Sequence, residues 1–383
     1  MTTPSAYELD AWKNIQKHRS PMAAQAGHAV ADNVVKGAAK MGQAAKKGLD
    51  RVPGASSTLA KGLGGLSKGA GFVGEKAKKV GDQVPEGAVN WGKEAVASTQ
   101  KSLAKAARVG LSPEAVVKRH QKNGHAVKNL LDVRSLDLEL VDAVKPRGRQ
   151  WIYPALGAVS GGAAGLAITG GEAAVTLSAG VAAAPTAGVI AGSIAADAAA
   201  VLTMSSRAVG EIALSYGYDP EEPVEKIFSM SVINAGSAIS SASKFAAFRD
   251  ISKLTQAMVR GGTWKTLNQS IISRVTAQFA KLFGVRFTRQ SLGKLIPAVG
   301  IVVGGAFNWS NLESVVDTAE VAYRRRFLLE KYPHLAEDDS SEFTEPAPTE
   351  ASDESKDQTI SVLEELAEAG GPDLLQEHDS KSV

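Results

Sequence analysis

Residues 152–171 read IYPALGAVSGGAAGLAITGG, a run of twenty positions without an acidic or basic side chain. The run belongs to a longer apolar stretch, residues 152–206, in which Glu172 and Asp197 are the only charged residues. At a rise of about 1.5 Å per residue, this stretch is long enough for two helices. Pro185 falls between the two halves and separates them. We therefore expect a glycine-rich apolar helical hairpin at the centre of the chain.

Glycine recurs in this stretch at the spacing of one helical face. Gly157, Gly161 and Gly165 are four residues apart, and Gly188 and Gly192 repeat the interval. Residues four apart lie one above the other on the same side of an α-helix, and small residues there let a second backbone approach closely. The spacing predicts tight helix–helix packing along this side.

The sequence leaves open whether the hairpin enters a membrane. A membrane-spanning helix needs about 20 predominantly apolar residues. Six of residues 152–171 are glycine, so insertion is marginal, and a tightly packed core hairpin outside the bilayer fits equally well. If the hairpin inserts, Glu172 and Asp197 are functional candidates, because a carboxylate in lipid needs a partner or a path to water. Otherwise they are helix-end or surface carboxylates.

The rest of the folded region is also predicted to be helical. Apolar residues recur at helical spacing on both sides of the hairpin, and no clear strand pattern occurs, so the expected fold class is all-α. The boundary signals are helix starts at Ser112-Pro113, Ser135, Tyr153-Pro154, Asp219-Pro220 and Ser310 (with Glu313 as a capping box), a break at Gly261-Gly262, and an end at Lys331 to Pro333.

Charge divides the chain into four parts. Residues 1–150 hold 25 Lys and Arg against 13 Asp and Glu, a net charge of +12, whereas residues 335–383 hold 2 against 15, a net charge of −13. The expected parts are an N-terminal helix (1–21), a basic Gly/Ala/Lys-rich arm that is largely disordered or weakly amphipathic (22–110), a helical domain (111–334) and an acidic disordered tail (335–383). Within the tail, only a short helix at residues 360–369 is expected.

The compartment is expected to be the cytoplasm. The chain has no cysteine, which fits a reducing environment. The first twenty residues lack the apolar run of a secretory signal, so the N-terminus is expected to stay on the cytosolic side. With the apolar hairpin, this predicts a protein that is peripheral to, or partly inserted in, the cytoplasmic membrane.

Motifs for cofactor or metal chemistry are missing or out of context. Residues 69–74, GAGFVG, have the spacing of a dinucleotide-binding loop, but no hydrophobic strand precedes them and no βαβ pattern surrounds them. His120 and His125 are five residues apart, unlike the pair of a zinc-binding helix, and are predicted to lie on the surface. The chain has no P-loop and no G-x-S-x-G nucleophile motif. We predict no cofactor, no metal site and no assigned catalytic residue.

Two basic features suggest an anionic partner. Arg324, Arg325 and Arg326 follow one another near the end of the last core helix, either as a contact for lipid phosphates or an acidic partner, or as a solvated basic face that favours the helix C-terminus. The basic arm has only Phe72 and Trp91 as aromatic residues, too few for stacking on nucleic-acid bases. An anionic membrane surface is therefore preferred over nucleic acid.

Several stretches in order resemble the EcsC family of bacterial proteins. They are Tyr7-Glu8 with Trp12, residues 129–138 (NLLDVRSLDL), residues 212–220 (IALSYGYDP), residues 304–308 (GGAFN) and residues 323–327 (YRRRF). The resemblance covers roughly residues 110–334 and the first helix; the basic arm and the acidic tail depart from it. The family is named after a gene beside an ABC transporter. The resemblance thus implies a link to membrane transport or secretion, with no catalytic residues to carry over.

These observations lead to two hypotheses of different classes. The first is a non-enzymatic, membrane-associated accessory or scaffold protein, with an anionic membrane or a membrane protein such as an ABC transporter as partner. The alternative is a cryptic hydrolase built from Tyr216, Asp219, Asn308 and Arg324, polar residues of the most distinctive motifs. Their convergence would favour the second hypothesis, and their dispersal would count against it. The candidate functional residues are Glu172, Asp197, Tyr216, Asp219, Asn308, Arg324 and Arg326.

Overall fold

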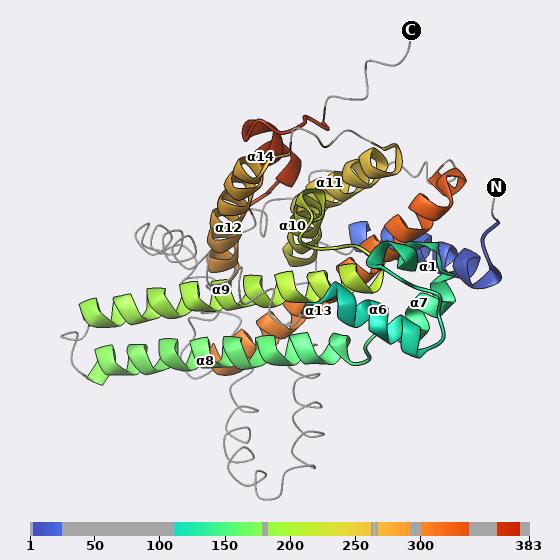
Figure 1. The fold of residues 1–383 in the computed structure, drawn as a ribbon. Coiled ribbons are helices and arrows are strands. Elements are labelled where there is room, and N and C mark those ends of the chain that lie inside the picture. The colour runs from blue at the N-terminus through green and yellow to red at the C-terminus, as the bar shows by residue number, and fades with distance from the viewer. Residues whose placement is uncertain are drawn as a thin grey trace, which may run out of the picture.

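The fold is that of a computed structural model, which describes residues 3–24, 111–177, 183–261, 264, 267–291, 300–336 and 358–375. Most of the expected basic arm, and residues 337–357 and 376–383 of the expected acidic tail, lie outside the described residues. Within these ranges every regular element is a helix, which confirms the all-α prediction (Figure 1).

The elements follow the chain in a simple order. They are α1 (Ala6–Ala24), α6 (Pro113–Lys122), η3 (Leu130–Ser135), α7 (Leu138–Val144), α8 (Arg149–Leu177), α9 (Ala183–Ser215), α10 (Pro223–Ser237), α11 (Ser241–Val259), α12 (Gln269–Ser291), α13 (Gly300–Lys331), η5 (Pro333–Ala336) and α14 (Val362–Glu368).

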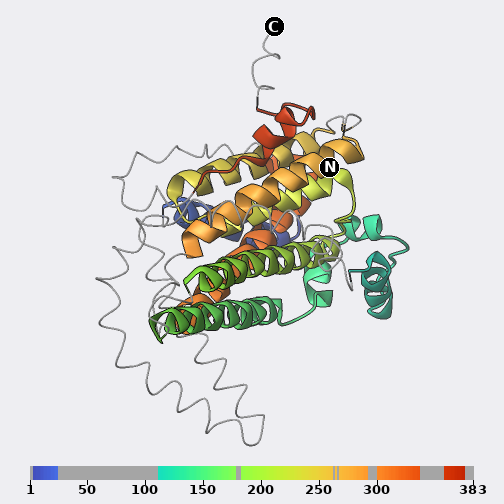
Figure 2. The same ribbon diagram turned by 90° about the vertical axis from the view of Figure 1, so that its left-hand side faces the viewer.

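Helix α13 is the axis of the molecule. It packs on α8, α9 and α10, and its C-terminal half also touches α1 and η3. Helices α8 and α9 follow each other in the chain and lie side by side. Helix α10 packs on both α13 and α9, and α11, α12 and α14 pack on α10 (Figures 1 and 2). Among the described residues, no helix combines the length and the hydropathy that a membrane-spanning segment requires.

The glycine side of α8 packs directly on α13. A Cβ atom on Gly161 would overlap the carbonyl group of Gly304 and lie 2.8 Å from the Asn308 side chain, and one on Gly157 would overlap Leu312. Two helix backbones meet here with no side chain between them, as small residues four apart allow. Gly165 is in the same helix, but its surroundings lie outside the described part of the chain.

The first helix is anchored by one buried carboxylate. Glu8 is fully buried; it accepts hydrogen bonds from Lys331 Nζ at 2.8 Å and Tyr332 Oη at 2.7 Å, and from the Leu138 backbone N–H at 3.2 Å. Burial works to raise the pKa of Glu8, but these hydrogen bonds outweigh it and hold the pKa below its usual value. Glu8 thus joins α1 to α7 and to the end of α13.

Two expected helix starts differ in the structure, and a third is confirmed. Asp137, rather than Ser135, is the N-cap of α7, where its side chain accepts a hydrogen bond from Glu139 N. Helix α10 begins at Pro223 after Glu222, so Asp219 is not its cap. A proline at the first helical position loses no helical hydrogen bond, which explains why the helix starts there. The Ser112 cap of α6 is confirmed, with Ala115 N at 3.1 Å.

Two long core helices, α8 and α13, run through expected boundaries. Helix α8 begins at Arg149 and contains Pro154, and α13 is continuous from Gly300 through Ser310. Pro154 is the sixth residue of α8, beyond the four N–H groups that have no helical partner, so it costs the helix one backbone hydrogen bond. Packing of α8 against α13 over both regions explains why the local stop and start signals are overridden.

Part of the expected acidic tail is folded onto the domain. Ile360, Val362, Leu363 and Leu366 are at most 1% exposed, and the expected short helix is present as α14. The short helix expected at residues 360–369 is thus confirmed, but it packs on the domain as part of an ordered segment, residues 358–375, instead of standing in a disordered tail. The reason is that the apolar residues of this segment fall on one side of a short helix, and the domain offers an apolar surface to cover them.

Replacing Gly161 with alanine tests the contact between α8 and α13. We expect Gly161→Ala to lower the free energy of unfolding by about 1–3 kcal/mol, because the new methyl group meets backbone that cannot move aside easily. Chemical denaturation monitored by circular dichroism measures the change. Val159→Ala in the same helix is the control; its side chain is 72% exposed, so stability should stay within about 0.5 kcal/mol. Equal stability of both variants would contradict the backbone contact.

Candidate functional site

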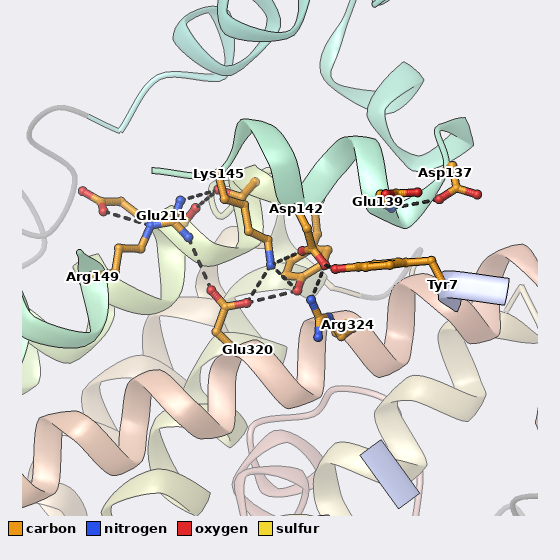
Figure 3. A network of polar contacts seen from close by, with 11 residues as sticks. Tyr7, Asp137, Glu139, Asp142, Lys145, Arg149, Glu211, Glu320 and Arg324 are labelled. Carbon is orange, nitrogen blue, oxygen red and sulfur yellow. Dashed lines mark hydrogen bonds and ion pairs between the residues drawn. The ribbon is translucent and has the colours of Figure 1, made fainter. Parts of the chain in front are cut away.

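A polar cluster lies where α1, α7, α8, α9 and α13 meet, and we call it the Lys145 network (Figure 3). Its members are Tyr7, Asp142, Lys145, Arg149, Glu211, Tyr216, Glu320 and Arg324. Two of the sequence-predicted candidates, Tyr216 and Arg324, belong to it. The other members come from helices far apart in the sequence, so the folded chain alone brings them together.

Lys145 is at the centre of this network. Its ammonium group is 2.8 Å from both Asp142 Oδ1 and Glu320 Oε2 and contacts the Tyr216 hydroxyl. The Tyr216 hydroxyl also donates to Glu320 Oε2 at 3.0 Å. Burial, followed by the nearby Glu320 charge, raises the pKa of Tyr216 well above its usual value. Tyr216 is therefore a neutral hydrogen-bonding phenol at physiological pH and not a phenolate nucleophile.

The two ends of the network are closed by arginines. Arg324 pairs with Asp142 Oδ2, which also accepts a hydrogen bond from Tyr7 Oη at 2.8 Å. At the other end, Arg149 is 6% exposed and lies 3.7 Å from Glu211 and 3.6 Å from Glu320. Each carboxylate of the network thus faces at least one cation. Groups tied in this way join α1, α7, α8, α9 and α13 to one another.

A second cluster surrounds Arg326, and we call it the Arg326 cluster. Arg326 is 3% exposed and makes a bidentate ion pair with Glu225, with N–O distances of 2.6 and 2.8 Å. Burial lowers the pKa of Arg326, but the Glu225 charge outweighs this and raises it. Glu330 accepts from Arg326 Nε at 2.7 Å and from Tyr218 Oη at 3.0 Å. The guanidinium groups of Arg326 and Arg134 both lie over the Tyr218 ring.

The Arg326 cluster explains the Tyr-Gly-Tyr turn at residues 216–218. Gly217 has a φ of +85°, and a Cβ there would meet the Arg134 side chain at 2.9 Å and the Leu130 carbonyl oxygen at 3.0 Å. Arg134 Nε donates to the Gly217 carbonyl oxygen at 2.8 Å. A glycine is needed for both the backbone angle and the close approach. The turn sends Tyr216 to one cluster and Tyr218 to the other.

The Arg324 to Arg326 triplet does not form the exposed basic face that the sequence suggests. Arg325 and Arg326 are 6% and 3% exposed, and Arg324 pairs with Asp142. Consecutive helical residues point in directions about 100° apart, so each arginine meets a different neighbour. Lipid phosphates and solvent are therefore both ruled out as the surroundings of Arg326.

The remaining predicted candidates lie elsewhere. Asp197 is 3% exposed in the middle of α9, where it accepts from Ser160 Oγ at 2.8 Å and Asn308 Nδ2 at 2.6 Å, so it is not a surface or helix-end carboxylate. Asp219 caps the turn at Glu221 N, at 2.9 Å. Glu172 lies in α8, but its side chain is outside the described residues.

The four residues of the hydrolase hypothesis do not converge. Tyr216 and Arg324 share the Lys145 network, Asn308 is about 24 Å from Arg324 along α13, and Asp219 caps a separate turn. The described residues also include no group of three or more histidine or carboxylate side chains placed to hold a metal ion. The arrangement therefore gives the hydrolase hypothesis no support.

Sequence reasoning missed the partners of these residues. Several partners are ordinary charged residues in the sequence, yet each pairs with a residue from another part of the chain. They are Lys145, Glu320, Glu225 and Glu8. The i,i+4 spacing of Arg326 and Glu330 was a usable local signal. The Glu225 to Arg326 pair has no such signal, because 101 positions separate the two residues.

His120 is buried, contrary to its predicted surface position. It is 1% exposed, and its Nδ1 lies 2.9 Å from that of His125. Burial, followed by the neighbouring His125 and Arg119, lowers the pKa of His120 to about 4. One of these two nitrogens donates the hydrogen bond and the other accepts it, which fastens the end of α6 to the following loop.

An apolar stripe remains exposed on α8. Trp151, Ile152, Leu156 and Val159 are 49%, 55%, 50% and 72% exposed. Residues 152, 156 and 159 follow the i, i+4, i+7 spacing of one helical face. Exposed apolar groups of this size, contiguous on one helix, mark a surface that meets a partner or a membrane. We call these four residues the α8 stripe.

Comparison with known proteins places the fold in a family. The family model of the EcsC protein family matches residues 5–328. This chain belongs to the EcsC family. An uncharacterized protein, YdbA of Bacillus subtilis (strain 168), is 29% identical over 141 residues, which are 36% of this chain and 48% of YdbA. The chain thus spans about half the length of that relative. No solved structure matches.

Removing the charge of Arg326 tests the structural role of the Arg326 cluster. We expect Arg326→Leu to lower the free energy of unfolding by about 3–5 kcal/mol, because Glu225 then stays buried without a counter-charge. The double variant Glu225→Leu with Arg326→Leu should recover part of the loss. Arg260→Leu, at an exposed position, is the control for loss of an arginine. A double variant less stable than Arg326→Leu would contradict this account. Urea denaturation measures all four proteins.

The buried histidine predicts a loss of stability in acid. Because the folded-state pKa of His120 is about 4 against an ordinary 6.5, the unfolded chain binds the proton first as pH falls. Its contribution, roughly 3 kcal/mol, is complete above pH 6.5 and lost as the pH falls toward 4. His120→Gln should flatten the stability profile in this window. His334→Gln, at an exposed position, should leave the profile as it is. Parallel profiles of wild type and His120→Gln would exclude His120 as the source.

Proposed function

We propose that this EcsC protein is a non-enzymatic accessory or scaffold protein that attaches to the cytoplasmic membrane through the α8 stripe. The observation that carries the proposal is the exposure of Trp151, Ile152, Leu156 and Val159 on one helix. In this proposal α8 and α9 form the glycine-rich apolar hairpin, and the stripe is its outward side. Tryptophan and large aliphatic residues are the side chains that enter the boundary between lipid headgroups and acyl chains.

The charge of the chain supports an anionic lipid surface. Arg147 is exposed just before α8, and residues 1–150 carry a net charge of +12, with 25 basic against 13 acidic residues. Basic residues near an apolar helix add electrostatic attraction to anionic headgroups. The acidic segment after residue 335 has the opposite sign, so we propose that it stays away from the membrane.

A membrane protein completes the proposed assembly. The resemblance to the EcsC family, whose founding gene lies beside an ABC transporter, suggests a transport or secretion complex as the partner. A rigid helical body fixed by buried ion pairs suits a scaffold, because its surfaces keep their relative positions. The proposal assigns no catalytic step to the protein.

Vesicle flotation of the purified full-length chain tests this function. Vesicles of phosphatidylcholine alone are compared with vesicles that also contain phosphatidylglycerol. We expect binding to the second kind, and roughly 100-fold weaker binding of a triple variant, Ile152→Ser, Leu156→Ser and Val159→Ser, because three apolar contacts with lipid are lost. The control Leu131→Ser removes a 64% exposed leucine from η3 and should bind like the wild type.

The outcomes separate the contributions of the stripe and the charge. Unchanged flotation of the triple variant would sink the proposal. If high salt releases the wild type and the triple variant from the vesicles to the same extent, attachment is assigned to the basic arm instead. Circular dichroism of each variant shows whether the fold is kept, which is expected because the replaced side chains are exposed.

A further inference from the structure

Residues 358–375 cover an apolar face of the helical domain formed by α10, α11 and α12, and we call this face the groove. The segment crosses α10, α11 and α12, and α14 packs on all three (Figures 1 and 2). Ile360, Val362, Leu363 and Leu366 point into the groove and are at most 1% exposed. The acidic residues Glu364 and Glu368 stay on the outside. The contact thus has the form of a short amphipathic helix in an apolar groove.

A single carboxylate of the domain recognises the start of this helix. Asp250 of α11 is fully buried and accepts hydrogen bonds from Ser361 Oγ at 3.1 Å, from Val362 N at 2.7 Å and from Leu363 N at 3.3 Å. The first N–H groups of a helix have no partner within the helix. Asp250 supplies that partner from the domain, and Ser361 adds the ordinary N-cap to Glu364 N.

Two more domain residues hold the main chain of the segment. Asn234 Nδ2 donates to the Ile360 carbonyl oxygen at 2.7 Å, and Lys253 Nζ donates to the Leu375 carbonyl oxygen at 2.8 Å. Asn234 is itself oriented by Arg286, whose Nη1 donates to Asn234 Oδ1 at 2.6 Å. The domain thus binds the segment backbone at its entry, at the helix start and at its end. Main-chain hydrogen bonds with pockets for alternate side chains are the usual basis of peptide recognition.

The groove and the segment belong to different parts of the chain. All the groove residues fall within residues 5–328, the range that the family model matches, whereas the segment lies beyond it. Helix α14 has seven residues, far fewer than an isolated helix needs to be stable in water. Its helical form therefore depends on the groove, as expected for a ligand that folds when it binds.

We propose that the face of α10, α11 and α12 is a peptide-binding groove of this EcsC domain and that residues 358–375 are its intramolecular ligand. The groove takes an apolar residue in extended conformation, then a serine N-cap, then a short helix with apolar residues on one side and acidic residues on the other. Residues 337–357 are the tether between the domain and the ligand. The tether keeps the ligand at an effective concentration on the order of millimolar, so the ligand occupies the groove ahead of a competing segment.

Cleavage of the tether in the full-length protein tests this inference. A protease site placed within residues 337–357 leaves all groove and ligand residues unchanged. A fluorescent synthetic peptide of residues 358–375 is then added to the cleaved and the uncleaved protein, and its anisotropy is followed. We expect saturable uptake by the cleaved protein and at least about 100-fold weaker uptake by the uncleaved protein, where the tethered copy competes.

Peptide variants show whether the groove reads the ligand as the structure indicates, without changing the domain. Leu366→Ser in the peptide should weaken binding about 30-fold, because a buried leucine is lost, and Ser361→Ala should weaken it about fivefold, because the cap is lost. Glu368→Ser, an exposed position with the same replacement, should bind like the unchanged peptide.

Each other outcome overturns the proposal. If the cleaved protein stays folded, keeps its own fragment and takes up no peptide, the segment is a permanent part of the core and not a ligand. A cleaved protein that unfolds leads to the same conclusion. If the uncleaved chain forms dimers that exchange labelled segments, the occupant is a second copy and the intramolecular assignment is wrong.

Discussion

The contact of α8 with α13 at Gly161 and Gly304 is the constraint on which the rest of the fold depends. Because no side chain separates the two backbones, the helices cross at one fixed place. The crossing brings Asn308 to Asp197, whose buried carboxylate needs hydrogen-bond donors, and so fixes α9 as well. It also turns the opposite side of α8 outward, so the stripe at Ile152, Leu156 and Val159 is a consequence of the glycine packing.

Buried charge then determines how the other helices join α13. The C-terminal half of α13 forms an ion pair with each of these helices. It pairs with Glu8 of α1, with Asp142 of α7 and Lys145 at the C-terminal end of α7, and with Glu225 of α10. A buried ion pair adds little net stability, but breaking one is costly. Such pairs therefore act against wrong arrangements: any other docking of α1, α7 or α10 would leave a charge without a partner. This is why the distinctive sequence motifs are polar although no catalytic step has been assigned to them.

Local signals in the sequence predicted the helical class, the α6 cap at Ser112, the break at Gly261 and the close-packing side of α8. Each of these is a property of a few neighbouring residues. The capping signals at Asp219 and Ser310 were misleading: a competing local signal, the proline at Pro223, starts α10, and packing on α8 extends α13 back to Gly300. The Lys145 network could not be foreseen, since its charges come from four separate elements. His120 was misjudged for the same reason, as burial depends on neighbours that the sequence does not reveal.

The two large apolar faces of the domain differ in one physical respect. The groove of α10, α11 and α12 contains Asp250, a buried carboxylate whose pKa burial raises to about 6 in spite of its hydrogen bonds to the segment. Without an occupant, the groove would expose its apolar side chains and Asp250 to water. Residues 358–375 bury these side chains and donate hydrogen bonds to the Asp250 carboxylate. The α8 stripe contains no such polar group, and water in contact with it costs only the hydrophobic term, about 25 cal/mol per Å². A face of that kind can remain uncovered in the free protein and still favour an apolar surface when one is offered. This difference supports the two proposals: a specific peptide for the groove, which is covered, and a membrane, which requires no matching hydrogen bonds, for the stripe, which is exposed.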